Sequence, residues 1–357
     1  MLNVFNSWME RYFAEEEAVL VAVILTVSVV ILVTLGVVLA PMITAVIIAF
    51  LMQGAVARMK SWGASHNVSV SIAFFLLAGS IVLSLIFILP ALWHQAQNLA
   101  SETPKMLKQG QDVLLLLPER YPNIVTELQV KEFIAALRER VAGAGQSILS
   151  FSLTQIPILI SILIYLVLVP ILVFFFLKDS AIILAWLANM LPRRRPIMRQ
   201  IWTEMNQQIA NYVRGKFIEI VIVGGVSSIV FGLLGLNYAL LLGLVVGLSV
   251  LIPYIGALVV TLPVAVIGFF QWGWSNDLVY VIVAYGIIQA LDGNVLVPVL
   301  FSEAVNLHPV GIILAVLVFG GLWGFWGIFF AIPLATLCKA IINAWPTRES
   351  ALPASSD

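Results

Sequence analysis

Residues 220–276 read IVIVGGVSSIVFGLLGLNYALLLGLVVGLSVLIPYIGALVVTLPVAVIGFFQWGWSN and contain no charged side chain. As one helix, this stretch would extend over about 86 Å, because a helix rises 1.5 Å per residue. The hydrocarbon core of a bilayer is only about 30 Å thick. The stretch therefore predicts several apolar helices that fold back on one another.

The composition of the whole chain agrees with this stretch. Of the 357 residues, 62% are hydrophobic and 10% are charged, against roughly 45–50% and about 25% in soluble domains. The formal charge is zero, which excludes a basic nucleic-acid-binding protein and an acidic disordered chain. The single Cys338 excludes an intrachain disulfide and a cysteine-cluster metal site. We predict an all-α polytopic protein of an inner or plasma membrane, with about eight transmembrane segments and no metal, cofactor or nucleic acid.

Charge-free runs indicate where the chain crosses the membrane. The run between Glu17 and Arg58 is long enough for two spans, with Pro41 at the turn between them. The acidic residues before this run are unlike a cleaved secretory signal, so the first span is expected to remain. The expected divisions are three spans in 1–94, an extracytoplasmic helical cap in 95–150, a fourth span in 151–177, cytoplasmic interfacial helices in 178–216, a C-terminal membrane half in 217–345 and a tail in 346–357.

Two polar segments set the orientation. Residues 178–216 carry seven basic and two acidic side chains, and residues 95–147 carry six of each. Lys and Arg stay on the cytoplasmic side, and one span separates the two segments. The 178–216 segment and both termini are therefore predicted to be cytoplasmic, and 95–147 to be outside.

Each polar segment allows two interpretations. Within 95–147, apolar residues recur at helical spacing, as either a membrane-lying cap or a gating module: Val130, Phe133, Ile134, Leu137 and Val141. Within 178–216, Pro196 is expected to open a helix. The Arg193–Arg195 run suits anionic lipid headgroups or acts only as a topology determinant.

Two long apolar stretches are broken near their middle. Residues 238–271 are interrupted by Pro253-Tyr254-Ile255-Gly256, and residues 309–342 by the run Gly320–Gly327. Proline and glycine at these places predict two helices of about 15 residues in each stretch, too short to cross the membrane singly. Re-entrant hairpins entering from opposite sides fit, and such broken pairs mark transporter binding sites. Ordinary two-span hairpins are the alternative.

Asp292 is the strongest candidate for a substrate-binding or coupling residue. An ionisable group inside an apolar span costs free energy, and such groups usually have a function. Gln289 shares its helix face at i, i+3, Gly293 is expected to loosen the helix, and Asn294 adds a further polar group. A structural role, such as capping a hairpin, is the alternative for this carboxylate.

The other candidates each have an ordinary explanation beside the functional one. Glu219 is expected in a surface ion pair with Arg214 or Lys216. Glu303 and His308 lie before the second broken stretch, where His308 either titrates near neutrality or caps a helix. Trp323 and Trp326 either stack on a substrate or pack as ordinary aromatic residues. No nucleophile elbow, zinc-binding His-Glu motif or phosphate-binding glycine loop is present, so an enzyme is not expected.

Several motifs together resemble the autoinducer-2 exporter family. They cover most of the chain: Lys178-Asp179, Asn211–Lys216, Pro253–Gly256, Asp292–Pro298, Asn306–Pro309, Gly321–Gly327 and Ala331–Pro333. The resemblance implies a secondary transporter that assembles as a homo-oligomer, a pentamer, and moves in an elevator fashion. It also implies that Pro253, Tyr254 and Gly256 form one hairpin tip, that Gly321, Trp323, Gly324, Trp326 and Gly327 form the other, and that Asp292–Asn294 face them.

Three functions remain in view. The first is export of a small polar solute, such as an autoinducer-2-like signal, and the second is sodium– or lithium–proton antiport through Asp292. The third is a membrane scaffold that recruits partners through 95–147. Residues 217–338 contain four carboxylates and no Lys or Arg, which favours a neutral or cationic passenger, or proton coupling. Besides this passenger, the expected partners are membrane lipids and further copies of the chain.

Overall fold

The computed structural model describes residues 16–115, 156–192, 195–301 and 307–344, with short pieces at 128–129, 131–132 and 134–136. The described part is helical throughout, and seven of its helices are long and apolar enough to cross a membrane. No more than a third of the residues in each of these apolar stretches are buried, so their large hydrophobic side chains face outward. The predicted class, an all-α polytopic membrane protein, is confirmed.

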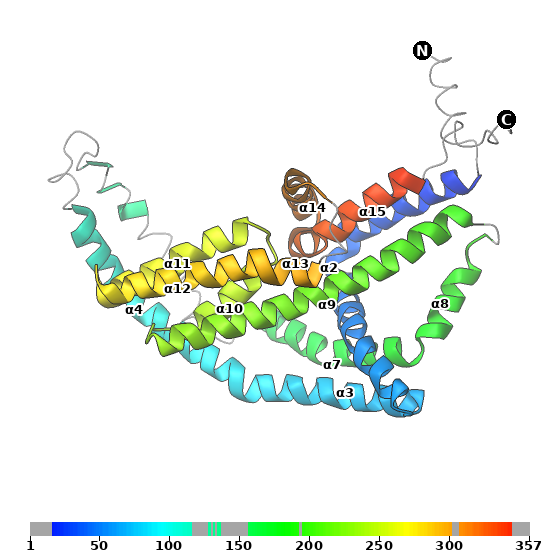
Figure 1. Ribbon diagram of the computed structural model, residues 1–357, viewed down its shortest axis with the longest axis horizontal. Helices are drawn as coiled ribbons and strands as arrows, with labels where there is room; N and C mark the ends of the chain where they lie inside the picture. The colour runs from blue at the N-terminus through cyan, green and yellow to red at the C-terminus, as the bar shows by residue number, and fades with distance from the viewer. Residues whose placement is uncertain are drawn as a thin grey trace, which may run out of the picture.

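The turn predicted at Pro41 is wrong. Helix α2 (Glu16–Ser61) continues through Pro41 and changes direction part-way along its length (Figure 1). A proline removes one backbone hydrogen bond and bends a helix, but the remaining bonds continue on either side. The expected two-span hairpin is therefore one bent helix.

The third predicted span also extends further than expected. Helices α3 (His66–Leu83) and α4 (Leu89–Leu115) are joined by the π-helical turn η1 (Ser84–Ile88) into one continuous helix. This helix includes the first part of the predicted cap. Of the predicted apolar stripe in the cap, only Ile134 lies within the described residues.

The N-terminal half has its own core. α2, α3 and α7 (Ile156–Lys178) pack together around a cluster that includes Ala45, Val70 and Val173. The short α8 (Ser180–Asn189) then leads to α9 (Pro196–Leu233), in which Pro196 occupies the first turn as predicted. Residues 196–233 thus form one helix that joins the predicted cytoplasmic segment to the next span.

α9 runs the length of the C-terminal half (Figure 1). The elements that follow it are α10 (Ala239–Ser249), α11 (Ile255–Trp272), α12 (Asn276–Leu291), the π-helical turn η3 (Asp292–Leu296), α13 (Val297–Phe301), α14 (Pro309–Phe329) and α15 (Ala331–Ala344). Of these, α10, α12, η3, α13 and α15 contact α9. The largest core lies between α9, α10, α11 and α12 and includes Phe231, Val246, Val264 and Val281, each with no exposed area.

Glycines bring α9 and α10 into backbone contact. A Cβ atom on Gly247 would lie 2.7 Å from the Ile220 carbonyl oxygen and 2.8 Å from the Cα atom of Gly224. Close approach of this kind is typical of helix pairs in membranes, where small residues replace hydrophobic burial as the source of packing energy. α9 and the first arm of the next hairpin are therefore held as a unit.

Both broken stretches form helix–break–helix units. α10 and α11 are joined by the turn at 250–254, and α14 breaks at Gly324 (φ 60°, ψ −135°) before α15 begins. At 1.5 Å per residue, α10 is about 16 Å long and α15 about 21 Å. Each unit thus has one arm shorter than the hydrocarbon core of about 30 Å. We call α10–α11 hairpin 1 and α14–α15 hairpin 2.

The base of hairpin 1 is fixed to α4. The Gln95 side chain accepts a hydrogen bond from the Leu241 N–H (2.9 Å), and the Tyr238 hydroxyl donates to the Glu102 carboxylate (3.1 Å). Burial and the Glu102 carboxylate raise the pKa of Tyr238 to about 12. The hydroxyl consequently remains a donor over the physiological pH range.

Candidate functional site

Three polar side chains project from one face of α9 into the protein. Tyr212, Lys216 and Glu219 follow one another at i, i+4 and i+7, a spacing that places them on one helix face. Their exposed fractions are only 3%, 4% and 2%. Burying a polar group costs free energy unless the group is paired. The partners of these three side chains therefore show which elements this face of α9 contacts.

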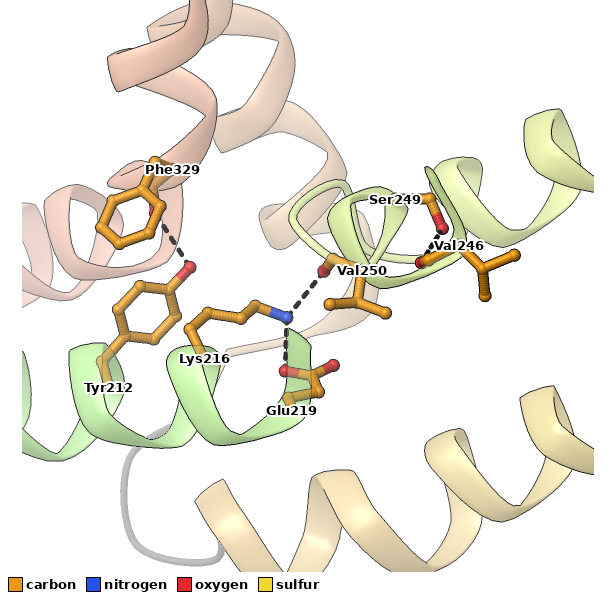
Figure 2. A network of polar contacts seen from close by, with 7 residues as sticks. All are labelled: Tyr212, Lys216, Glu219, Val246, Ser249, Val250 and Phe329. Carbon is orange, nitrogen blue, oxygen red and sulfur yellow. Dashed lines mark hydrogen bonds and ion pairs between the residues drawn. The ribbon is translucent and has the colours of Figure 1, made fainter. Parts of the chain in front are cut away.

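The Lys216 ammonium joins α9 to hairpin 1. Its Nζ atom donates to Glu219 Oε2 (2.8 Å) and to the Val250 carbonyl oxygen (2.7 Å) in the turn of the hairpin (Figure 2). It also lies 5.4 Å from the centroid of the Phe301 ring. The ion pair expected for Glu219 is therefore present, but it is buried, and the expectation of a surface pair is wrong.

Tyr212 joins the same helix to hairpin 2. Its hydroxyl donates to the Phe329 carbonyl oxygen (2.8 Å), next to the break between α14 and α15 (Figure 2). Around it, Leu251 of hairpin 1, Phe301 of α13 and Ile312 of hairpin 2 pack in one apolar cluster. Ile252 packs with Ala315 and Val316 in a second cluster. One face of α9 thus binds both hairpin tips, and the tips contact each other.

Glycines allow each tip to close tightly. A Cβ atom on Gly256 would overlap the Ser249 carbonyl, and one on Gly327 would overlap the Phe319 carbonyl. Gly324 needs its positive φ, whereas Gly321 has open space around it. Three of the glycines selected by sequence therefore shape the tips: Gly256 and Gly327 by close contact with backbone, and Gly324 by its positive φ.

The remaining residues selected in hairpin 1 lie at its surface. Tyr254 is 61% exposed and has a left-handed backbone (φ 64°). Pro253 precedes it and is partly buried. The observed turn at 250–254 begins three residues before the predicted break at Pro253, because Val250 already leaves the helix where its carbonyl accepts the Lys216 ammonium.

Asp292 lies where the helix is loosened, as predicted from Gly293. The π-helical turn η3 begins at Asp292 and contacts α9, the helix that carries Lys216. Asn294 donates to the Ala290 carbonyl (2.8 Å). Asp292 Oδ1 and Gln289 Nε2 are buried atoms without a hydrogen-bond partner among the described residues. This acceptor and donor are available for a polar ligand.

Two other candidates make the contacts of their ordinary explanations, and their functional alternatives stay predictions. His308 is exposed and its Nδ1 accepts from the Val310 N–H (3.3 Å), so it caps α14. Trp323 and Trp326 both stack on Phe330, at 6.1 and 6.4 Å between ring centroids. Glu303 lies outside the described residues. No group of His, Cys, Asp and Glu suited to a metal ion is found in the described part of the chain.

Comparison with known proteins identifies the family. The model of the AI-2E family transporters matches residues 18–347. The chain belongs to the AI-2E transporter family. It is 46% identical to permease PerM of Escherichia coli (strain K12) over 98% of this chain and 99% of the relative. It is 25% identical to the transport protein YueF of Bacillus subtilis (strain 168) over 84% and 82% of the two chains. The resemblance drawn from the motifs is confirmed, and this AI-2E protein is a multi-pass membrane transporter.

Sequence reasoning missed two residues of the buried polar face of α9. Tyr212 and Lys216 appear in the sequence motif 211–216, but Lys216 was counted among the cytoplasmic bases. The i, i+4, i+7 spacing of Tyr212, Lys216 and Glu219 was the available signal, because three polar residues on one face of an apolar helix require buried partners.

Proposed function

We propose that this protein is a secondary-active transporter of a small polar solute, with its substrate site where the two hairpin tips meet α9 and Asp292. The observation that carries the proposal is the attachment of both tips to one α9 face through Tyr212 and Lys216. Arms of about 16 and 21 Å support re-entrant hairpins, whose breaks would lie at membrane depth only inside protein or beside a water-filled cavity.

The free polar groups favour a neutral or cationic solute. Asp292 Oδ1 is a buried acceptor without a hydrogen-bond partner among the described residues, and Gln289 Nε2, Arg214 Nε of α9 and Trp323 Nε1 of hairpin 2 are donors without one. The Lys216 charge is already paired with Glu219. A polar solute such as an autoinducer-2-like signal would find hydrogen-bonding partners here, whereas an anion would face the Asp292 carboxylate.

The packing supports an elevator-type movement. The core of α2, α3 and α7 is separate from the core of α9 to α12. α2 residues Ile47, Phe50 and Leu51 pack at the edge of the tip cluster. α2 is thus an element along which a unit carrying the hairpins would slide against a fixed N-terminal unit.

The test compares two carboxylates of the same helical segment. Flux is measured in proteoliposomes with a solute identified by an untargeted metabolite comparison of cells with and without the protein. We expect Asp292→Asn to abolish flux, because the carboxylate that faces the passenger is lost. The matched control is Asp277→Asn, at the exposed start of α12, and its flux should equal that of the wild type. Full flux in Asp292→Asn would overturn the assignment of this carboxylate.

Cation–proton antiport through Asp292 is the second candidate, favoured by the same unpartnered carboxylate oxygen on the π-helical turn that contacts α9. A pH jump that drives sodium or lithium through liposomes, with no solute flux, would select it. If neither solutes nor ions move under any gradient, the result would favour the alternative that the protein is a membrane scaffold. Assembly as a homo-oligomer, a pentamer, stays a prediction that a mass measurement in detergent would test.

A further inference from the structure

An apolar cavity of about 920 Å³ lies beside α8, away from the hairpin tips. α2, α8, α9 and α15 surround it. Its interior is lined by aliphatic and thioether side chains, including Val21, Leu25, Leu187, Ile201, Met205 and Leu337. A cavity of this size is large enough for a drug-sized or larger apolar group.

Basic side chains line part of this cavity. Arg195, at the N-cap of α9, and Arg199, in its first turn, are among the lining residues, with Trp202 about one turn further. Arg195 is held in place because its Nη1 atom donates to the Ala188 carbonyl. Arg199 is exposed, and the described residues form no ion pair with either guanidinium. Positive charge without an ion-pair partner among the described residues thus lies beside the apolar lining.

A carboxylate is also present at this end of α9. The Glu17 Oε1 atom accepts a hydrogen bond from the Met198 N–H (2.9 Å). Glu17 therefore caps the start of the helix, where an anion would otherwise be favoured by the helix dipole. A bound anion would consequently depend on the two guanidiniums.

The apolar space continues along the same face of α8. A second cavity of about 670 Å³ shares Leu184, Leu187 and Trp202 with the first, and Lys60 is among its lining residues. Two adjoining apolar cavities that both include basic residues suit an amphiphile with two chains and an anionic head. A soluble anion would not contact the apolar lining, and an uncharged hydrocarbon would not interact with the arginines.

We propose that these cavities bind an anionic phospholipid, its phosphate on Arg195 and Arg199 and its acyl chains along α8. Arginine binds phosphate oxygens in bidentate fashion, and basic pockets between helices bind anionic headgroups. Because α9 and α15 both line the first cavity, the lipid braces the helix that carries Tyr212 and Lys216 against hairpin 2. The binding step does not depend on which solute is transported.

The experiment measures lipid retention by the full-length protein. Delipidated protein in detergent is titrated with dioleoyl phosphatidylglycerol or dioleoyl phosphatidylcholine and analysed by native mass spectrometry. A basic residue near an anionic surface strengthens binding about fivefold, so Arg195→Gln/Arg199→Gln should weaken phosphatidylglycerol binding about thirtyfold. The charge-conserving Arg195→Lys/Arg199→Lys variant should retain most of it, and Ala188→Trp, which places an indole in the first cavity, should lower retention of both lipids.

The matched control removes two exposed charges elsewhere, as Lys105→Gln/Lys108→Gln on α4, and should bind lipid like the wild type. Equal binding of the two lipids by the wild type, or undiminished binding by the arginine variant, would overturn the proposal. Displacement of the lipid by millimolar inorganic phosphate would show a free-anion site instead. If Ala188→Trp changes the oligomer mass while lipid retention is unchanged, the cavity accommodates a second copy of the chain and the proposal is wrong.

Discussion

The buried ammonium of Lys216 makes three contacts at once: to Glu219, to the Val250 carbonyl and to the Phe301 ring. Replacing one partner of a buried ion pair leaves the other charge uncompensated and typically costs about 3–5 kcal/mol. Replacing both partners with apolar residues is often neutral. The pair can therefore be tested by comparing single and double substitutions.

We expect Lys216→Met to lower the free energy of unfolding in detergent by about 3–5 kcal/mol, with much of the loss recovered in Lys216→Met/Glu219→Leu. Unfolding is followed by tryptophan fluorescence against denaturant. Lys105→Met, on the exposed face of α4, is the control and should unfold like the wild type. A double variant as unstable as the single one would show that the ion pair is not the source of the loss.

Gly324 offers a test of backbone strain alone, because a Cβ atom there would meet nothing within 4 Å. Its φ of 60° and ψ of −135° are accessible only to glycine without strain. We expect Gly324→Ala to cost about 1–3 kcal/mol, measured in the same unfolding assay. Gly321→Ala, three residues earlier and equally uncrowded, should instead be neutral or stabilising, and similar losses in both would contradict the argument.

At the scale of helices, the backbone contact between α9 and α10 is the feature that the site depends on, since it holds the first arm of hairpin 1 against the helix that carries Lys216. We expect Gly247→Ala to force the two helices apart and to cost about 1–3 kcal/mol, because its Cβ would lie 2.7 Å from the Ile220 carbonyl oxygen. Thermal unfolding in detergent measures the change. Gly225→Ala on the open side of α9 is the control, and an equal loss there would refute the contact as the cause.

The helices also show what sequence alone could predict. Charge-free runs predicted the apolar helices, and Gly293 predicted the loosened turn at Asp292, because both depend on local composition. The Pro41 turn was wrong because a proline restricts its own backbone but does not decide whether the helix resumes. The burial of Lys216 depends on the carbonyl of Val250, which lies 34 residues away in the chain. A count of basic residues does not contain this contact, because it treats every lysine as exposed to water.

For the whole molecule, orientation across the membrane stays a prediction with a direct test. In a Cys338→Ser background, Asn343→Cys on α15 should react with an impermeant maleimide only in inverted vesicles, because both termini are predicted to be cytoplasmic. Ser101→Cys on α4 should react only in intact spheroplasts. Both positions are exposed. Labelling of both from the same side would show that the positive-inside assignment is wrong.

The shortness of α10 has a consequence for biosynthesis. Insertion into the bilayer is governed by apolar windows of about 19 residues, and α10 has 11. It cannot leave the translocation channel as a spanning helix of its own. The nascent chain must therefore retain α10 until α11 has been synthesised, with α9 as the surface against which its glycines pack. We therefore expect the glycine contact between α9 and α10, which shapes the folded protein, to form already during insertion.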